Sequence, residues 1–183
     1  MKTKTSRRAR RLKAEVSQGD HVKGFPRAPV TLVGYGDFTN PGGLETYRTI
    51  KKIRRKMGPR LRYVFRSFPR LGDRDSSGAA EAAECASTQG RFWEMHDRLF
   101  EGEGASDEFR LSRHATDLGL DLRLFLRELK THAHAAKLEA VRRGGVRSGV
   151  VTAPAFFINS RRHESSFGVA TLLPAVQAEA GDA

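Results

Sequence analysis

The segment APVTLVGYGDFTNPGG, residues 28–43, joins an apolar strand to the start of a helix. Residues 30–35 are rich in β-branched and aromatic side chains, so we expect a buried central strand. Asn40 and Pro41 indicate a helix start, because Asn accepts hydrogen bonds from first-turn amides and Pro leaves no amide unpaired. The segment therefore predicts the first strand and helix of an α/β protein.

Beyond this segment, helical and strand patterns alternate. Apolar residues recur every three or four positions from Leu44 to Met57, which predicts a helix that ends at Gly58-Pro59. The order of the predicted elements is β-α-β, a helical block, then β-β-α. The later elements are strands at 61–67, at 155–159 and near His163–Ser166, almost continuous helix at 75–145 with Asp121 and Thr131 opening helices, and a helix at 169–180.

The length of 183 residues and a hydrophobic content of 38% favour one folded domain over a disordered chain. A single cysteine, Cys85, excludes an intramolecular disulfide and a cysteine-rich zinc site, and we expect it to be a small buried residue. No apolar run approaches ~18 residues, so no membrane span is expected. No apolar signal region follows the basic N-terminus, which leads us to expect a cytoplasmic protein.

The formal net charge of +12 is concentrated in two segments. Residues 1–13 contain seven basic side chains and residues 51–70 contain nine, and neither segment contains Asp or Glu. Such charge attracts nucleic acid or acidic partners by Coulomb steering, whereas ordinary solvated charge is the alternative interpretation. We predict a basic flexible tail at residues 1–20 and a basic patch on the first helix. The patch residues are Lys51, Lys52, Arg54, Arg55 and Lys56.

Common catalytic and cofactor motifs are missing from the sequence. The turn of residues 34–39 lies where a dinucleotide-binding loop would lie, but Thr39 stands at its third glycine position. A P-loop and a Gly-x-Ser-x-Gly motif do not occur. His132 and His134 are two positions apart on a predicted helix, hence on different faces, so no metal site is predicted. His96 is expected to pack in the core.

Three segments resemble DsbA-like thioredoxin-fold proteins: residues 28–38, residues 89–97 (QGRFWEMHD) and residues 152–159 (TAPAFFIN). They occur in the order found in the family, and the resemblance runs from about Asp20 to Gln177. It implies a thioredoxin-like α/β fold with a large helical insertion. The implied divisions are a tail at 1–20, a first thioredoxin half at 21–74, the helical insertion at 75–148 and a second thioredoxin half at 149–183.

The resemblance implies a thiol:disulfide oxidoreductase with Cys-x-x-Cys at the start of the first helix. By position, those cysteines fall on Asn40 and Gly43, and Pro41 and Gly42 lie between them. The acidic residue that often stands six positions before the nucleophile falls on Gly34. The proline that faces the site, usually in the cis form, falls on Pro154, the one feature retained.

A carboxamide at position 40 neither ionises near pH 7 nor forms a mixed disulfide, so we expect dithiol exchange to be absent. Cys85 lies in the helical insertion and is a poor substitute nucleophile. In thioredoxin-like folds the segment before the proline binds an extended peptide by strand addition. Thr152, Ala153 and Pro154 therefore either bind a peptide or protein partner, or only form a turn.

Two other functions stay open. Gly42 and Gly43 leave bare first-turn amides at the helix start, so the Asn40–Gly43 segment could bind an anion in a glutathione-binding, transferase-like enzyme. Loss of an unused site is the alternative explanation for these glycines. The remaining hypothesis is a basic adaptor for nucleic acid or acidic partners, acting through the tail and the patch. No metal is expected, and no cofactor other than glutathione.

Overall fold

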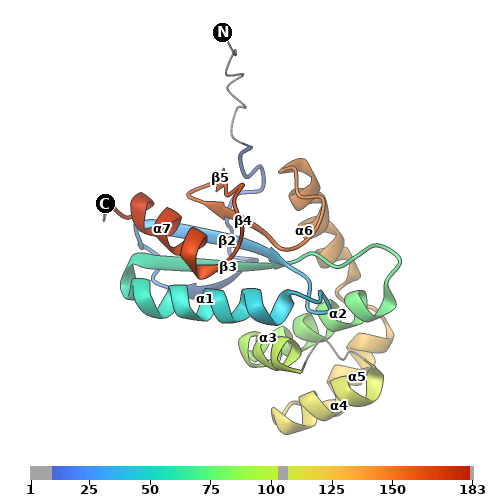
Figure 1. The fold of residues 1–183 in the computed structure, drawn as a ribbon. Helices are drawn as coiled ribbons and strands as arrows, with labels where there is room; N and C mark the ends of the chain where they lie inside the picture. Colours follow the sequence, from blue (N-terminus) through green and yellow to red (C-terminus); the bar gives the residue numbers. More distant parts are fainter. Residues whose placement is uncertain (1–9, 103–106, 182–183) are drawn as a thin grey trace.

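Figure 1 shows the computed structural model, which describes residues 10–102 and 107–181. Within these residues a five-stranded mixed sheet has the order β1-β3-β2-β4-β5. The strands are β1 (His21–Gly24), β2 (Val30–Gly36), β3 (Leu61–Ser67), β4 (Ala155–Ile158) and β5 (Arg161–Arg162). The helices are α1 (Gly43–Met57), the short 3-10 helix η1 (Gly58–Arg60), α2 (Arg74–Thr88), α3 (Phe92–Glu101), α4 (Glu108–Asp117), α5 (Leu122–Lys130), α6 (Ala135–Arg147) and α7 (Val169–Glu179). The predicted order of elements is confirmed, with β1 added at its beginning.

β2 and β3 form the centre of the sheet and run parallel, with Val33 opposite Val64. β1 pairs antiparallel with β3, and β4 pairs antiparallel with β2. Both central strands are almost entirely buried, since helices lie on both faces of the sheet. Burial on both faces explains the nearly continuous apolar run of β2, whereas Arg62 and Arg66 interrupt the apolar run of β3.

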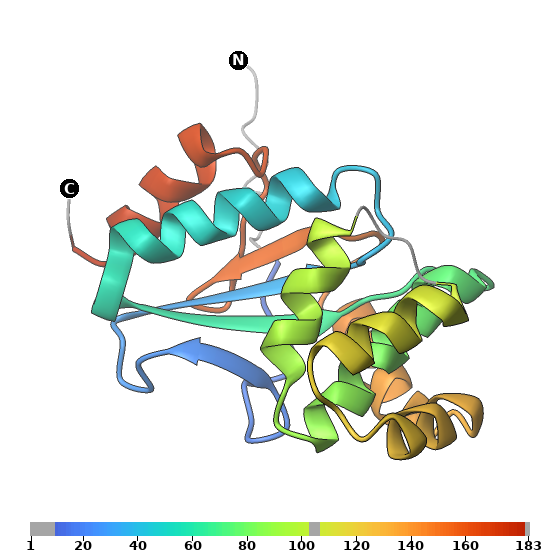
Figure 2. The same cartoon turned by 90° about the horizontal axis from the view of Figure 1, so that it is seen from below.

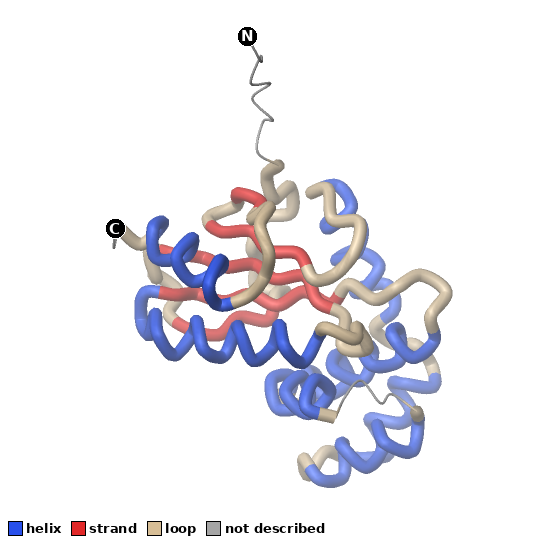
Figure 3. The backbone as a smooth tube through the Cα atoms, in the orientation of Figure 1, coloured by secondary structure: helices blue, strands red, loops and turns tan. Residues whose placement is uncertain are grey.

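The two faces of the sheet carry different helices. α1, α3 and α7 pack on the face that presents Leu32, Phe65 and Phe156. α6 and the N-terminal segment cover the opposite face, which presents Tyr35 and Phe157. α2 to α5 gather beside one end of the sheet, as Figures 2 and 3 show. The loop between β2 and α1 therefore lies at the edge between the sheet and the helical block.

Several element boundaries differ from the predictions. α1 begins at Gly43 rather than at Pro41, because the Asn40 side chain makes its own turn with the Gly42 N–H. β5 lies at residues 161–162 rather than near His163–Ser166. β1 was not predicted because this short edge strand is only half buried, which gives it little apolar signal.

The turn between α5 and α6 also differs from the prediction. Thr131 does not open α6; it ends α5, and its hydroxyl donates to the Arg127 carbonyl at 2.9 Å. His132 has a positive φ of 51°, a conformation that interrupts a right-handed helix. The prediction that Asp121 opens α5 is confirmed, since its carboxylate accepts from the Leu124 N–H at 2.9 Å.

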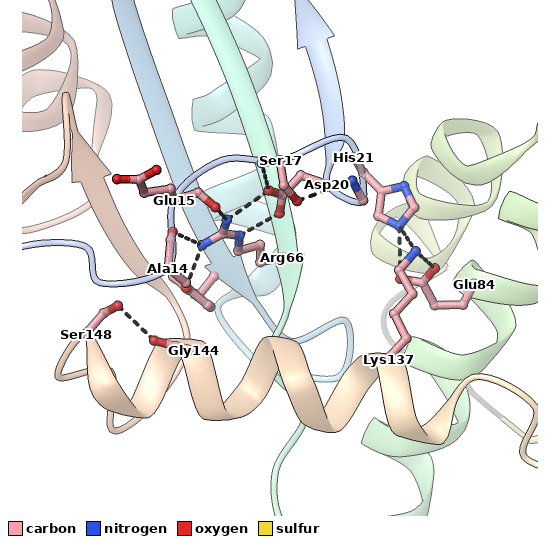
Figure 4. Close-up of polar contacts among 12 residues, drawn as sticks. Ala14, Glu15, Ser17, Asp20, His21, Arg66, Glu84, Lys137, Gly144 and Ser148 are labelled. Atoms are coloured by element: carbon pink, nitrogen blue, oxygen red, sulfur yellow. Dashed lines mark hydrogen bonds and ion pairs between the residues drawn. The ribbon is translucent and has the colours of Figure 1, made fainter.

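Residues 10–20 are held against the sheet, in contrast to the predicted flexible tail; residues 1–9 lie outside the described residues. The Leu12 N–H donates to the Ser160 carbonyl at 2.8 Å, beside β5. Arg66 on β3 donates to both carboxylate oxygens of Asp20 and to the carbonyls of Ala14 and Glu15, as Figure 4 shows. A buried guanidinium on the central sheet thus fixes a segment that its sequence alone marks as solvated.

Candidate functional site

The predicted site residues lie in two loops at one end of the sheet. Residues 37–42 connect β2 to α1, and residues 151–154 lead into β4. Because β2 and β4 are antiparallel neighbours, with Tyr35 opposite Ala155, the two loops meet. The Ala153–Pro154 peptide bond is cis.

The side chain of Asn40 joins these two loops. Its Nδ2 donates to the carbonyl of Ala153 at 3.0 Å, and its Oδ1 accepts from the Gly42 N–H at 2.9 Å. A carboxamide can make both bonds at once because it carries a donor and an acceptor. The carbonyl of Ala153, one of the predicted partner-binding groups, is therefore already engaged within the chain.

The helix start offers few free amides for an anion. The Gly42 N–H donates to Asn40 Oδ1, and the Gly43 N–H donates to the Asn40 carbonyl at 2.7 Å. Glu45 lies in the first turn of α1, where its negative charge repels an anion. This geometry disfavours the hypothesis of a glutathione or anion site at Asn40–Gly43.

Gly34 and Gly43 stand where neighbouring aromatic rings leave little space. A Cβ added at Gly34 would lie 2.7 Å from Phe156 Cε1 and 3.2 Å from the Tyr63 hydroxyl. A Cβ at Gly43 would lie 3.2 Å from Phe100 Cε1. Phe156 thus occupies the space that a side chain at position 34 requires, whereas a side chain at position 43 requires a small shift of Phe100.

Cys85 lies in α2 and is fully buried, as predicted for a small core residue. It lines neither the small cavity nor the open groove that lie on the two sides of Asn40. Burial raises the pKa of the thiol to about 12, and the charges of Glu128 and Glu81 act in the same direction. The thiol is therefore protonated at neutral pH, whereas a reactive cysteine requires a thiolate.

Asp37 and Arg70 belong to this site although the sequence did not single them out. Asp37 directly follows β2 and is buried; its Oδ1 accepts from the Thr39 N–H at 3.0 Å and from the Ser76 hydroxyl at 2.9 Å. Its Oδ2 lies 3.5 Å from Arg70 Nε. The signal that points to Asp37 is its position directly after a buried strand, where side chains reach the end of the sheet.

A small apolar cavity of about 30 Å³ lies beneath the two loops, between α1, α3 and the sheet. His96 lines it and is buried, as predicted, with Nδ1 2.8 Å from Asp97 Oδ1. Its Nε2 has no hydrogen-bond partner among the described residues. Burial lowers the pKa of His96, although Asp97 acts in the opposite direction, so the ring is neutral. The volume is sufficient for about one water molecule.

An open groove of about 480 Å³ lies on the other side of Asn40. Its floor and rim include Phe68, Val150 and the exposed side chains of Leu71, Val146 and Val151. The groove is bordered by the backbone of residues 151–153, and no backbone hydrogen bond within the described residues uses the N–H groups of that segment. Apolar side chains and free backbone N–H groups therefore lie side by side.

The predicted basic patch forms the outer face of α1. Lys51, Lys52, Arg55 and Lys56 are exposed and Arg54 is half-buried, while Tyr47, Ile50 and Ile53 pack inward. A surface groove of about 720 Å³ runs along this face between α1 and the end of β1. Lys51 reaches Glu101 at 3.3 Å. Lys51 and Arg54 of the patch also line the small cavity beside Asn40.

None of the described helices is both long enough and apolar enough to cross a membrane. A family model described as thioredoxin matches residues 16–178. A Na⁺/H⁺ antiporter NhaA 1 from Salinispora arenicola is 37% identical over 158 residues, which are 86% of this chain and 24% of the antiporter. One from Mycobacterium sp. (strain KMS) is 35% identical over 164 residues, with 87% and 26% covered. The chain spans about a quarter of the length of these curated relatives.

Several solved structures share this fold. BdbD from Bacillus subtilis matches with a TM-score of 0.83 at 20% identity, covering 94% of this chain and 98% of that one. A thioredoxin-like oxidoreductase from Silicibacter pomeroyi matches with 0.79 at 24% identity, covering 91% and 95%. The alpha-DsbA1 protein of Wolbachia pipientis matches with 0.80 at 20% identity, covering 93% and 94%. At these identities the likeness concerns the fold, and the expected DsbA-like arrangement is confirmed.

Proposed function

The chain belongs to the thioredoxin family, and from that premise we propose that it binds an extended segment of a partner protein without exchanging disulfides with it. The observation that carries the proposal is the hydrogen bond from Asn40 Nδ2 to the Ala153 carbonyl, 3.0 Å long. A carboxamide stands at the position of the family nucleophile and ties the helix start to the loop before Pro154. It supplies neither a thiolate nor a leaving group.

The second part of the proposal is partner binding. The groove beside residues 151–153 combines exposed apolar side chains with unused backbone N–H groups, which suits strand addition by an extended peptide. Val151 is 81% exposed and Val146 is 51% exposed, so both are available to a partner. We therefore propose that the partner contributes an extended, apolar segment, and that its binding does not require a cysteine in that segment.

The absence of dithiol exchange is tested with an insulin-reduction assay. We expect the wild-type chain and the Cys85→Ser variant to give the same background rate, because the Cys85 thiol is buried and protonated. A thioredoxin-family enzyme with an intact Cys-x-x-Cys serves as positive control. Turnover that disappears on Cys85→Ser substitution would contradict the proposal.

Partner binding is tested on an array of cysteine-free peptides, with the strongest binders measured by fluorescence anisotropy. We expect Val151→Asp and Val146→Asp to weaken binding at least about tenfold, since each replaces an apolar contact of the groove by a charge. Phe109→Asp is the matched control, because Phe109 is 75% exposed on α4 and lies outside the groove.

A second peptide series asks whether the backbone of residues 151–153 takes part. Methylating a single backbone nitrogen of the bound peptide removes one ladder hydrogen bond and leaves its side chains unchanged. We expect alternate positions to lose affinity, because a strand pairs through every second residue. Equal affinity of all the methylated peptides would refute strand addition at this site. So would a loss of peptide affinity in Phe109→Asp as large as that in the groove variants.

The curated relatives suggest a class of partner. In those proteins the matching segment is part of a longer Na⁺/H⁺ antiporter chain. The covalent link gives the segment a high effective concentration relative to the rest of the antiporter. We therefore propose an antiporter as the partner class. The test compares binding of the purified chain to nanodiscs with and without an antiporter. Binding confined to the loaded discs and lost in Val151→Asp supports it, whereas equal binding to empty discs contradicts it.

A further inference from the structure

Three side chains of different chemistry converge inside the helical block, away from Asn40. They are Cys85 on α2, Glu128 on α5 and His134, which caps the N-terminus of α6. One ligand atom from each lies within 4.8 Å of the other two, and within the described residues this is the one such group of three. A thiol, a carboxylate and an imidazole are the protein ligands that zinc prefers.

The contacts within this cluster leave the sulfur without a disulfide partner and orient the carboxylate beside it. The Cys85 side chain is fully buried, forms no disulfide, and has its own backbone amide as a hydrogen-bond donor to the sulfur. His134 Nε2 lies 3.2 Å from Glu128 Oε2, so these two groups already face each other. The single proton of the Thr88 hydroxyl faces two acceptors, the Cys85 carbonyl at 2.8 Å and Glu128 Oε2 at 3.1 Å, which share it. The carboxylate is thus oriented from a second side.

The dimensions suit a small cation. Zinc–ligand bonds of about 2.0–2.3 Å in a tetrahedral site separate the ligand atoms by roughly 3.3–3.8 Å. Ligand atoms that already lie within 4.8 Å need only small side-chain rotations to reach these separations. Side-chain exposures of 16% for His134 and 18% for Glu128 leave the cluster open to an entering ion and to one water molecule.

The charges also suit a divalent cation. A thiolate and a carboxylate together carry two negative charges, so a bound divalent ion makes the buried cluster neutral. Glu81 and Glu84 lie on the same helix as Cys85 and add negative potential. Glu84 is paired with His21 and Lys137, and Glu81 with His132, which leaves the pair of Glu128 and His134 to the ion.

We propose that Cys85, Glu128 and His134 bind Zn²⁺, with water as the fourth ligand and the Thr88 hydroxyl orienting the carboxylate. On binding, the Cys85 S–H bond breaks, the sulfur–zinc bond forms and the proton passes to solvent. The ion joins α2, α5 and the start of α6, so it stabilises the helical block. This site is independent of partner binding at the groove and revises the expectation that the sequence holds no metal site.

The experiment uses the full, untagged chain after chelator treatment and titrates it with Co²⁺, which takes the place of zinc and is visible by absorption. We expect a sulfur-to-cobalt charge-transfer band in the near ultraviolet, which Zn²⁺ abolishes by displacement. The band must vanish in Cys85→Ser, while Zn²⁺ must raise the melting temperature of the wild-type chain. Co²⁺ bound without the sulfur band would overturn the proposal.

Further variants test the site even if the Cys85→Ser chain fails to fold. His134 is only partly buried, and His134→Gln should weaken Zn²⁺ binding by more than tenfold. Thr88→Ala should weaken it by about 10–100-fold, because Thr88 orients the Glu128 carboxylate. His132→Gln is the matched control, because His132 pairs with Glu81 and is not one of the three ligands. Equal Zn²⁺ affinity in His134→Gln and wild type would also overturn the proposal.

Discussion

At the residue scale, two side chains bind segments that are far apart in the sequence. Asn40 connects the helix start to the loop before Pro154 through one donor and one acceptor, each hydrogen bond contributing about 1 kcal/mol. Arg66 uses its planar guanidinium to bind Asp20, two backbone carbonyls and the Tyr35 hydroxyl. Lysine could not replace it, because a single ammonium group lacks this fork of donors.

Replacing Arg66 tests its role in holding residues 10–20. We expect Arg66→Ala to reduce the free energy of unfolding by about 3–5 kcal/mol, because it leaves the carboxylate of Asp20 buried without its partner. Chemical denaturation measures this loss. Hydrogen exchange at the Leu12 amide should accelerate in the same variant. The double variant Arg66→Met with Asp20→Asn should lose less, and an equal or greater loss would contradict the ion-pair explanation.

The same pair predicts a pH dependence. Burial acts to raise the pKa of Asp20, but the hydrogen bonds and charge of Arg66 and the Ser17 N–H outweigh it and lower the pKa below 3.8. The folded state therefore binds this proton less readily than the unfolded state. The contribution to stability is complete above pH 3.8 and shrinks as the pH falls towards the lowered pKa. Chemical denaturation at several acidic pH values should show that the difference in free energy of unfolding between wild type and Arg66→Ala becomes smaller as the pH falls.

At the scale of elements, α6 approaches the sheet through a glycine. A Cβ added at Gly145 would lie 2.8 Å from Phe68 Cε2 and 2.9 Å from Tyr35 Cε1. The helix continues through Gly144 and Gly145 to Arg147, although the sequence predicted its end at these glycines. Close packing against two aromatic rings, rather than chain termination, explains Gly145.

Gly145→Ala separates helix propensity from packing. Alanine favours a helix interior over glycine by about 1 kcal/mol, but overpacking against Phe68 and Tyr35 costs about 1–3 kcal/mol. We therefore expect a net loss of stability in thermal or chemical denaturation. Phe68→Leu should suppress part of this loss by making room for the methyl group. A more stable Gly145→Ala chain would show that the contact is not tight.

At the scale of the whole molecule, a net charge of +12 is spread unevenly over the surface. The exposed cations of α1 line one face and its groove, while near Asn40 the half-exposed Arg70 pairs with the buried Asp37. Two acidic side chains of α2, Glu81 and Glu84, are buried and paired with histidines and a lysine. The groove along α1, which a polyanion is predicted to occupy, shares no lining residue with the proposed peptide groove.

Binding to a short DNA duplex tests this surface. We expect weak binding whose logarithm falls linearly with the logarithm of salt concentration, by about 0.9 per phosphate neutralised. The triple variant Lys51→Glu, Lys52→Glu and Arg55→Glu should abolish it. An equal charge change on α5, with Arg123, Arg127 and Lys130 each replaced by Glu, is the control. If both triple variants lose binding equally, net charge and not this face is responsible.

The strands at residues 61–67 and 155–158, the helix of residues 122–130 and the apolar stripe of α1 could be predicted from the sequence, because periodicity and capping act over a few neighbouring residues. The missing sulfur chemistry at Asn40 followed from residue type alone, since no fold gives a carboxamide a thiolate. Tertiary structure decided what depends on distant segments: the bond between Asn40 and Ala153, the anchoring of residues 10–20 by Arg66, and the meeting of Cys85, Glu128 and His134. These contacts join positions between 40 and 120 residues apart or assemble three helices. Local sequence patterns carry no information about which distant side chains come together when the chain packs.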